Sequence, residues 1–161
     1  MVKINVLIDN QPGDNALLEC EHGLSFYIET GCSKVLCDMG ASEKFISNAA
    51  CMGIDLSAID FAFVSHGHAD HTGGLPDYLK TFGEKKVYLS ERISKEMYFS
   101  SRRGHRRDIS TERSVFENHQ DRFVLLKESC WITPEIAAVY TDAHEHSQPL
   151  GNAFLSKEVH G

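Results

Sequence analysis

The sequence lacks the features that mark membrane-spanning, secreted or disulfide-rich proteins. No apolar run approaches the length of a membrane span, and the first five residues carry no secretory signal pattern. The five cysteines are odd in number and include no Cys-x-x-Cys pair. Because disulfides persist in oxidising compartments, we expect reduced thiols and a cytoplasmic location.

Basic residues are also scarce. The chain has 16 Lys and Arg against 23 Asp and Glu, a formal net charge of −7, so neither nucleic acid nor a membrane is an expected partner by default. Hydrophobic residues make up 42% and charged residues 24% of the 161 residues, which is an ordinary globular composition. We expect one domain over residues 1–161, with a substantial core.

The most informative stretch is residues 64–75, Val-Ser-His-Gly-His-Ala-Asp-His-Thr-Gly-Gly-Leu. Directly after the apolar run 59–64 it places four metal-binding side chains in six positions: His66, His68, Asp70 and His71. Alternate residues of an extended chain point the same way, so His66 and His68 can approach one ion together. Imidazole suits zinc and iron, and a carboxylate extends the choice to manganese. The alternative is a polar loop rich in histidine by chance, but with only nine histidines in the chain the pattern favours a metal site.

Apolar runs bounded by turn residues predict strands over 2–8, 17–21, 24–29, 34–37, 59–64, 86–89 and 122–127, with one or two more over 131–140. Helical spacing predicts helices over 42–52, 73–82 and about 90–98. Strands and helices alternate from residue 59 to residue 98, so the sheet should be at least partly parallel. Ser42 is expected to cap the first helix.

Two motifs resemble the metallo-β-lactamase superfamily. Residues 66–71 resemble its His-x-His-x-Asp-His signature, and residues 34–40 are similar to its strand that ends in Asp-x-Gly. Residues 23–29 resemble a subgroup related to a dihydropteroate-synthase-like enzyme, and the likeness extends over roughly residues 1–142. The resemblance implies an α/β fold, an αββα sandwich of two sheets that are each covered by helices.

The resemblance also implies a reaction. One or two divalent ions, zinc above all and manganese or iron as alternatives, would be bound by His66, His68, Asp70 and His71. The family's enzymes use a metal-bound hydroxide, and Asp70 would orient this nucleophile. We therefore expect a hydrolase acting on an ester, amide or phosphoester of a small-molecule substrate, which could be anionic. The Asp38 carboxylate would accept hydrogen bonds from the metal-binding loop or from a ligand histidine and so orient the metal ligands. The alternative, that Asp38 caps the helix over 42–52, is less favoured because Ser42 is better placed for that cap.

The sequence departs from the family pattern after residue 142. A third histidine for the first ion, a bridging aspartate and a last histidine have no counterpart, so we expect a domain that is incomplete at the C-terminus and truncated to its first sheet and helices. An uncovered apolar sheet face predicts a homo-oligomer. The alternative to an enzyme is a catalytically incomplete metal-binding fragment or assembly domain of the same fold. His144 and His146 stay open as ligands or as solvated loop residues.

Two further features leave alternatives open. Four arginines lie within residues 102–107, the one basic cluster of the sequence. They could form a lid that binds an anionic substrate, or a surface loop with solvated charges. His22 lies in an acidic turn, where a solvated side chain is the simpler interpretation.

Overall fold

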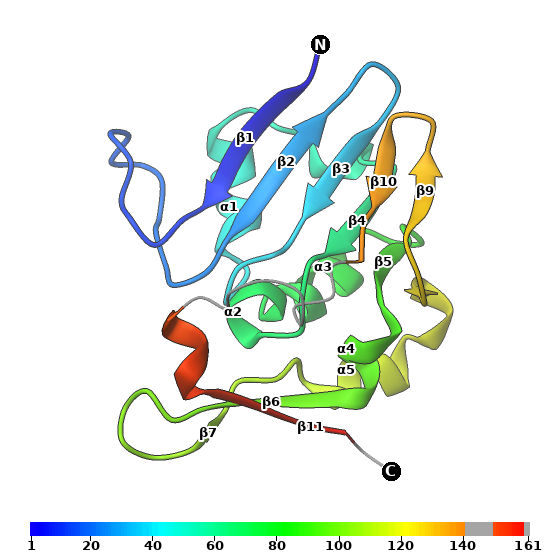
Figure 1. The fold of residues 1–161 in the computed structure, drawn as a ribbon. Coiled ribbons are helices and arrows are strands. Elements are labelled where there is room, and N and C mark those ends of the chain that lie inside the picture. Colours follow the sequence, from blue (N-terminus) through cyan, green and yellow to red (C-terminus); the bar gives the residue numbers. More distant parts are fainter. Residues whose placement is uncertain (141–149, 160–161) are drawn as a thin grey trace.

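A six-stranded sheet forms the centre of the fold (Figure 1). The structure, a computed structural model, describes residues 1–140 and 150–159. In spatial order the strands are β1 (Lys3–Ile8), β2 (Ser25–Glu29), β3 (Lys34–Cys37), β4 (Phe61–Val64), β5 (Val87–Ser90) and β8 (Phe123–Leu126). The first three strands pair antiparallel, and β3, β4, β5 and β8 pair parallel. The partly parallel sheet predicted from the sequence is therefore confirmed.

Helices cover one face of this sheet. One row of paired residues runs across it through Tyr27, Leu36, Ala62 and Val87, and all four side chains are buried. In Figure 1, α1 (Lys44–Cys51) and α3 (Leu75–Thr81) lie behind the strands. Phe45 of α1 and Tyr78 of α3 are fully buried in the same apolar cluster. The core thus forms between the sheet and these two helices.

The opposite face of the sheet is less covered at β1. Ile4 and Val6 lie on the face of this strand that points away from the helices, and they are 60% and 46% exposed. They pair with Ile28 and Phe26 of β2, which are only half-buried. These four side chains form an apolar patch at the β1 edge of the sheet.

Smaller sheets complete the described chain. A hairpin of β9 (Cys130–Thr133) and β10 (Ile136–Ala138) is anchored by the Glu135 carboxylate, which accepts a hydrogen bond from the Cys32 backbone at 3.0 Å. A three-stranded sheet has the order β11 (Leu155–Val159), β6 (Glu96–Ser100), β7 (Arg107–Asp108). The remaining helices are α2 (Ala69–Thr72), α4 (Glu91–Lys95), α5 (Arg113–Asn118) and the 3₁₀ helices Leu56–Ala58, Gln120–Arg122 and Leu150–Phe154. The structure therefore has more beyond the first sheet than the sequence predicts.

The strand predicted over residues 17–21 is wrong. This segment has no ladder and is held to α1 by side chains instead. Asn48, which is buried, donates to the Glu19 carbonyl at 2.8 Å and accepts from the Glu19 backbone at 2.9 Å. The Glu21 carboxylate accepts from the backbone N–H groups of Ala41 and Ser42 at 2.9 and 3.0 Å. The two bonds of Asn48 satisfy the Glu19 backbone groups that a strand would have paired.

Two helix predictions also need correction. The helix predicted over 90–98 ends at Lys95, because Tyr98 and Phe99 instead join β6 and pair with β11. Aromatic side chains favour such a strand over a helix. The N-cap position of α1 falls at Glu43, one residue after the predicted Ser42, but the Ser42 hydroxyl still accepts from the Lys44 backbone N–H at 3.4 Å while it donates to Glu21 at 2.7 Å. Among the described helices, none has the length and apolarity that crossing a bilayer requires.

Candidate metal centre

Asp38 occupies a strained position at the end of β3. Its φ of +57° is the only positive value of a non-glycine residue within residues 1–140 and 150–159, and Asp tolerates this region better than most residues. The strand end is fixed because the Asp38 backbone N–H donates to Phe63 and its carbonyl accepts from the Ser25 hydroxyl at 2.8 Å. The side chain is 4% exposed. The buried carboxylate therefore has one well-defined orientation.

Both oxygens of this carboxylate contact the histidine loop. Oδ1 accepts from the Ser65 backbone N–H at 2.8 Å, and Oδ2 accepts from the Ser65 hydroxyl at 2.6 Å. Oδ2 also lies 2.8 Å from Nδ1 of His71. Since a carboxylate only accepts, Nδ1 of His71 carries the hydrogen, and Nε2 is left as the free side of the ring.

His66 is oriented through the same serine. Its Nδ1 lies 2.9 Å from the Ser65 hydroxyl, which already donates its single hydrogen to Asp38. The hydroxyl therefore accepts from Nδ1–H of His66, so His66 also presents Nε2 as a lone-pair donor. One buried carboxylate thus sets the tautomer of two imidazoles, one directly and one through Ser65.

The three imidazoles of the motif lie against one another. The ring centroids of His66 and His71 are 4.1 Å apart, and those of His66 and His68 are 4.5 Å apart. Potential ligand atoms of Asp38, His66 and His71 all lie within 4.8 Å of one another, while His68 joins the cluster by ring contact only. Tyr98 packs edge-on against His68 at 5.3 Å. The predicted proximity of the motif histidines is therefore what the structure has.

Burial and neighbouring charges shift the pKa values of these three imidazoles. Burial, followed by the neighbouring His71 and His68, lowers the pKa of His66 to about 4, and burial also lowers the pKa of His68. Burial opposes protonation of His71 as well, but the hydrogen bond to Asp38 and the charges of Asp38 and Asp70 raise its pKa. Neutral His66 and His68 retain the lone pairs that a metal ion requires.

Asp70 lies beside the cluster and not within it. Its Oδ2 atom is 3.8 Å from Nε2 of His71 and 3.4 Å from Nε2 of His22. His22 comes close because Gly23, with φ of +138°, lies against the Asp70 backbone. A Cβ on Gly23 would lie 1.9 Å from the Asp70 carbonyl oxygen. The contact between His22 and Asp70 is one that the sequence pattern did not predict.

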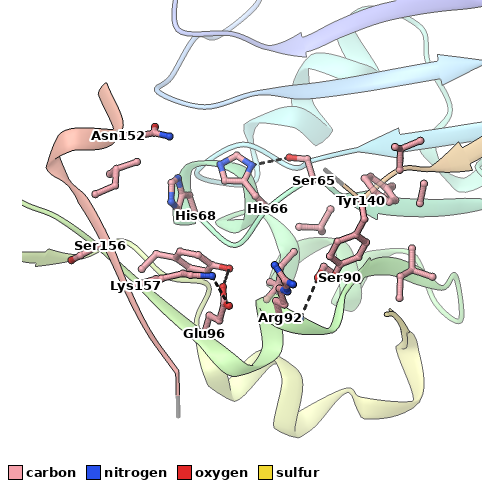
Figure 2. Close-up of a pocket in the computed structure, with 18 residues that line it drawn as sticks. Ser65, His66, His68, Ser90, Arg92, Glu96, Tyr140, Asn152, Ser156 and Lys157 are labelled. Atoms are coloured by element: carbon pink, nitrogen blue, oxygen red, sulfur yellow. Dashed lines mark hydrogen bonds and ion pairs between the residues drawn. The ribbon is translucent and has the colours of Figure 1, made fainter. Parts of the chain in front are cut away.

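A cavity of about 690 Å³ opens beside His66 and His68 (Figure 2). Its apolar wall includes Phe63, Ile93, Leu126 and Leu155, and its polar groups include Arg92 and Glu96. A volume of this size matches those of small-molecule sites. The cavity lies at the carboxyl ends of β4, β5 and β8, where ligands of open parallel sheets bind.

Other sequence-predicted candidates lie elsewhere. His144 and His146 fall outside the described residues. None of the four clustered arginines lines the cavity. Arg106 stacks on Phe99, with its Cζ 3.6 Å from the ring centroid, and pairs with Glu158, so the surface alternative for this loop is favoured over the lid.

A match to a protein-family model identifies the family of this chain. Residues 18–147 match the model of the metallo-beta-lactamase superfamily. The chain belongs to this superfamily. The match covers both motifs and the loop that carries His22.

Known proteins agree with this assignment. Over 89 residues the chain is 33% identical to 7,8-dihydropterin-6-methyl-4-(beta-D-ribofuranosyl)-aminobenzene-5'-phosphate synthase of Methanocaldococcus jannaschii, covering 52% of this chain and 30% of that protein. A crystal structure of a metal-dependent hydrolase of the beta-lactamase superfamily matches 85% of this chain and 47% of its own, with 28% identity and a TM-score of 0.65. A quorum-quenching N-acyl homoserine lactone lactonase shares the fold, with 15% identity and a TM-score of 0.51. This chain therefore spans less than half the length of the first two relatives.

Proposed function

We propose that this chain is a metal-dependent hydrolase that acts on an ester, amide or phosphoester bond of a small molecule. The observation that carries the proposal is the pair of imidazoles, His66 and His71, whose Nδ1 atoms are both fixed through Asp38. Metal-binding histidines commonly have their second ring nitrogen fixed by a carboxylate in this way. Superfamily membership supports the same class of reaction.

The donor set fits a divalent ion. In the proposal His66, His68, His71 and Asp70 bind one or two ions, with zinc the first choice and manganese or iron as alternatives. A divalent ion bound there would supply a water that loses its proton near neutral pH, and a positive charge beside the carbonyl or phosphoryl oxygen.

The side chains have separable tasks in this proposal. Asp38 and Ser65 keep the two imidazole rings in the tautomer that presents Nε2. Asp70 is the catalytic residue, because its carboxylate lies beside the cluster and can orient the attacking water. The apolar wall around Phe63 and Leu126 would hold the substrate and limit the access of bulk water.

Metal content on size-fractionated protein tests the proposal. The parent should contain close to one or two ions per chain, and the double variant His66→Ala/His68→Ala should lose most of them. A matched control, His105→Ala/His119→Ala, removes two histidines outside the cavity and should keep the parent's metal. If the His66→Ala/His68→Ala variant holds as much metal as the parent, the proposed site is wrong.

Turnover separates the proposal from its alternative. The parent should hydrolyse bis(4-nitrophenyl) phosphate or 4-nitrophenyl acetate, and the variant Asp70→Asn should lose this activity. Stoichiometric metal without hydrolysis of any ester, amide or phosphoester would support the alternative, a metal-binding domain without catalysis.

We also propose a cytoplasmic location. All five cysteines are free thiols, and Cys20, Cys32 and Cys51 are exposed, which suits a reducing compartment. Fractionation of cells that express the native gene tests this, and recovery in an oxidising compartment would overturn it.

A further inference from the structure

Among the described residues, the charges on the cavity wall do not cancel. In that part of the chain three charged side chains line the cavity: Arg92, Glu96 and Lys157. Glu96 is engaged on both oxygens, since Oε1 accepts from Lys157 Nζ at 2.8 Å and Oε2 accepts from the Tyr98 hydroxyl at 2.9 Å. Glu96 and Lys157 therefore neutralise each other, and the guanidinium of Arg92 is left as excess positive charge.

Arg92 has no carboxylate within 4.0 Å in the part of the chain that the structure describes. Its Cζ lies 5.4 Å from the centroid of the Tyr140 ring, and Ser90 bonds to both residues. The Ser90 hydroxyl accepts from the Arg92 backbone N–H at 3.2 Å and shares a hydrogen bond with the Tyr140 hydroxyl. A guanidinium placed over an aromatic ring uses none of its N–H donors in a carboxylate pair, so these donors are available for a ligand.

The fold places this cation on the same cavity as the histidines. His66 follows β4, and Arg92 follows β5, its parallel neighbour, so both lie at the carboxyl edge of the sheet. Figure 2 shows Arg92 between Glu96 and Ser90, and His66 and His68 on the same cavity. Ile93, Leu126 and Ala138 supply apolar wall. One molecule with an apolar body can thus touch Arg92 and the histidines together.

We propose that Arg92 is a binding residue for an anionic group of the substrate, a phosphate monoester or a carboxylate, carried on an apolar or aromatic body. The position of the reacting bond, beside His66 and His68, rests on the proposed hydrolase function. The anion site itself does not rest on it, because it needs only Arg92 and the cavity. A guanidinium forms paired hydrogen bonds with the oxygens of either anion.

The test compares three ligands that share one ring system: 2-naphthylphosphonate, 2-naphthoate and the neutral 2-naphthylmethanol. Their affinities are measured by titration calorimetry on the full chain as purified, and again after metal removal. The second series separates binding to Arg92 from binding to a metal ion. The variants are Arg92→Gln, which removes the charge, and Arg92→Lys, which keeps the charge without the planar fork.

Arg103→Gln is the matched control, because Arg103 is exposed and does not line the cavity. In the parent and the control, at least one anion should bind about tenfold more tightly than the alcohol, before and after metal removal. Arg92→Gln should abolish this preference and leave the affinity for the alcohol unchanged, which also shows that the cavity is intact. Arg92→Lys should retain only part of the preference.

The outcomes are distinct. Tighter binding of the phosphonate than of the naphthoate identifies a phosphate-bearing substrate, and the reverse order identifies a carboxylate. Equal affinity for the alcohol and both anions, a preference that survives in Arg92→Gln, or a preference that disappears with the metal each overturns the proposal. Absence of hydrolysis would overturn the proposed function alone, because these ligands are not hydrolysed.

Discussion

Oδ2 of Asp38 lies 2.8 Å from Nδ1 of His71 although the two residues are 33 positions apart in the sequence. The contact forms because β3 and β4 are parallel neighbours, which brings the ends of both strands to one edge of the sheet. Asp38 is buried and has a left-handed backbone conformation, so its carboxylate is fixed before any ligand arrives. This contact holds the His71 ring so that its Nε2 atom is the one that can bind a metal ion.

Replacing Asp38 by asparagine should weaken metal binding without unfolding the protein. Asparagine tolerates a positive φ, but it cannot offer two charged oxygens to Ser65 and His71. We expect the zinc affinity to fall about 10- to 100-fold. Competition with a chromophoric chelator measures this. Asp60→Asn is the control, since the Asp60 carboxylate accepts from the Lys34 backbone at 2.7 Å and belongs to no part of the histidine cluster. Equal affinities in the two variants would contradict the assigned role.

Gly23→Ala should destabilise the fold and disturb Asp70. The added Cβ would lie 1.9 Å from the Asp70 carbonyl oxygen, and φ of +138° is strained for alanine. We expect a loss of about 2 kcal/mol or more in the free energy of unfolding, measured by urea denaturation. Gly13→Ala is the matched control, because nothing lies within 4 Å of its Cβ and its change should stay within about 1 kcal/mol. Equal midpoints for the two variants would refute this prediction.

The thiol of Cys37 should resist modification in the folded protein. Burial, followed by the charge of Asp38, raises the pKa of Cys37 to about 12, so at pH 8 only roughly one thiol in ten thousand is the reactive thiolate. Cys20 and Cys51 are exposed and should react first with iodoacetamide. Peptide mapping by mass spectrometry after timed alkylation, with and without denaturant, tests this order. Modification of Cys37 as fast as Cys51 would show that the strand end opens.

Self-association, expected from the sequence, stays a prediction. Ile4 and Val6 of β1 are exposed, and a second copy of this chain could cover them. Light scattering should report a dimer or larger oligomer, and Ile4→Lys/Val6→Lys should shift it to the monomer. Leu17→Lys, at a residue 76% exposed in a loop, should not change the oligomeric state. A monomeric parent protein would contradict this prediction.

Much of the candidate site could be predicted from the sequence because its central residues are neighbours in the chain. His66, His68, Asp70 and His71 lie within six positions, so one strand end and one short helix bring the three imidazoles together, with Asp70 beside them. The orientation of Asp38 was predicted from the family motif, and its hydrogen bonds to Ser65 and His71 agree with that prediction. The strand prediction over residues 17–21 is wrong because it rests on local composition, whereas the hydrogen bonds that hold this segment, between Glu19 and Asn48 and between Ala41 and Glu21, join residues 20 or more positions apart.

The sequence by itself determined the clustering of the motif histidines and the partly parallel sheet, since short spacing and strand–helix alternation are local properties of the chain. Only the tertiary structure decided what surrounds the motif. The contact of His22 with Asp70, the packing of Tyr98 on His68 and the position of Arg92 over the Tyr140 ring join segments 30 to 48 positions apart. Such contacts follow from the packing of strands and loops around the sheet, and no periodic pattern in the sequence encodes which pairs will meet.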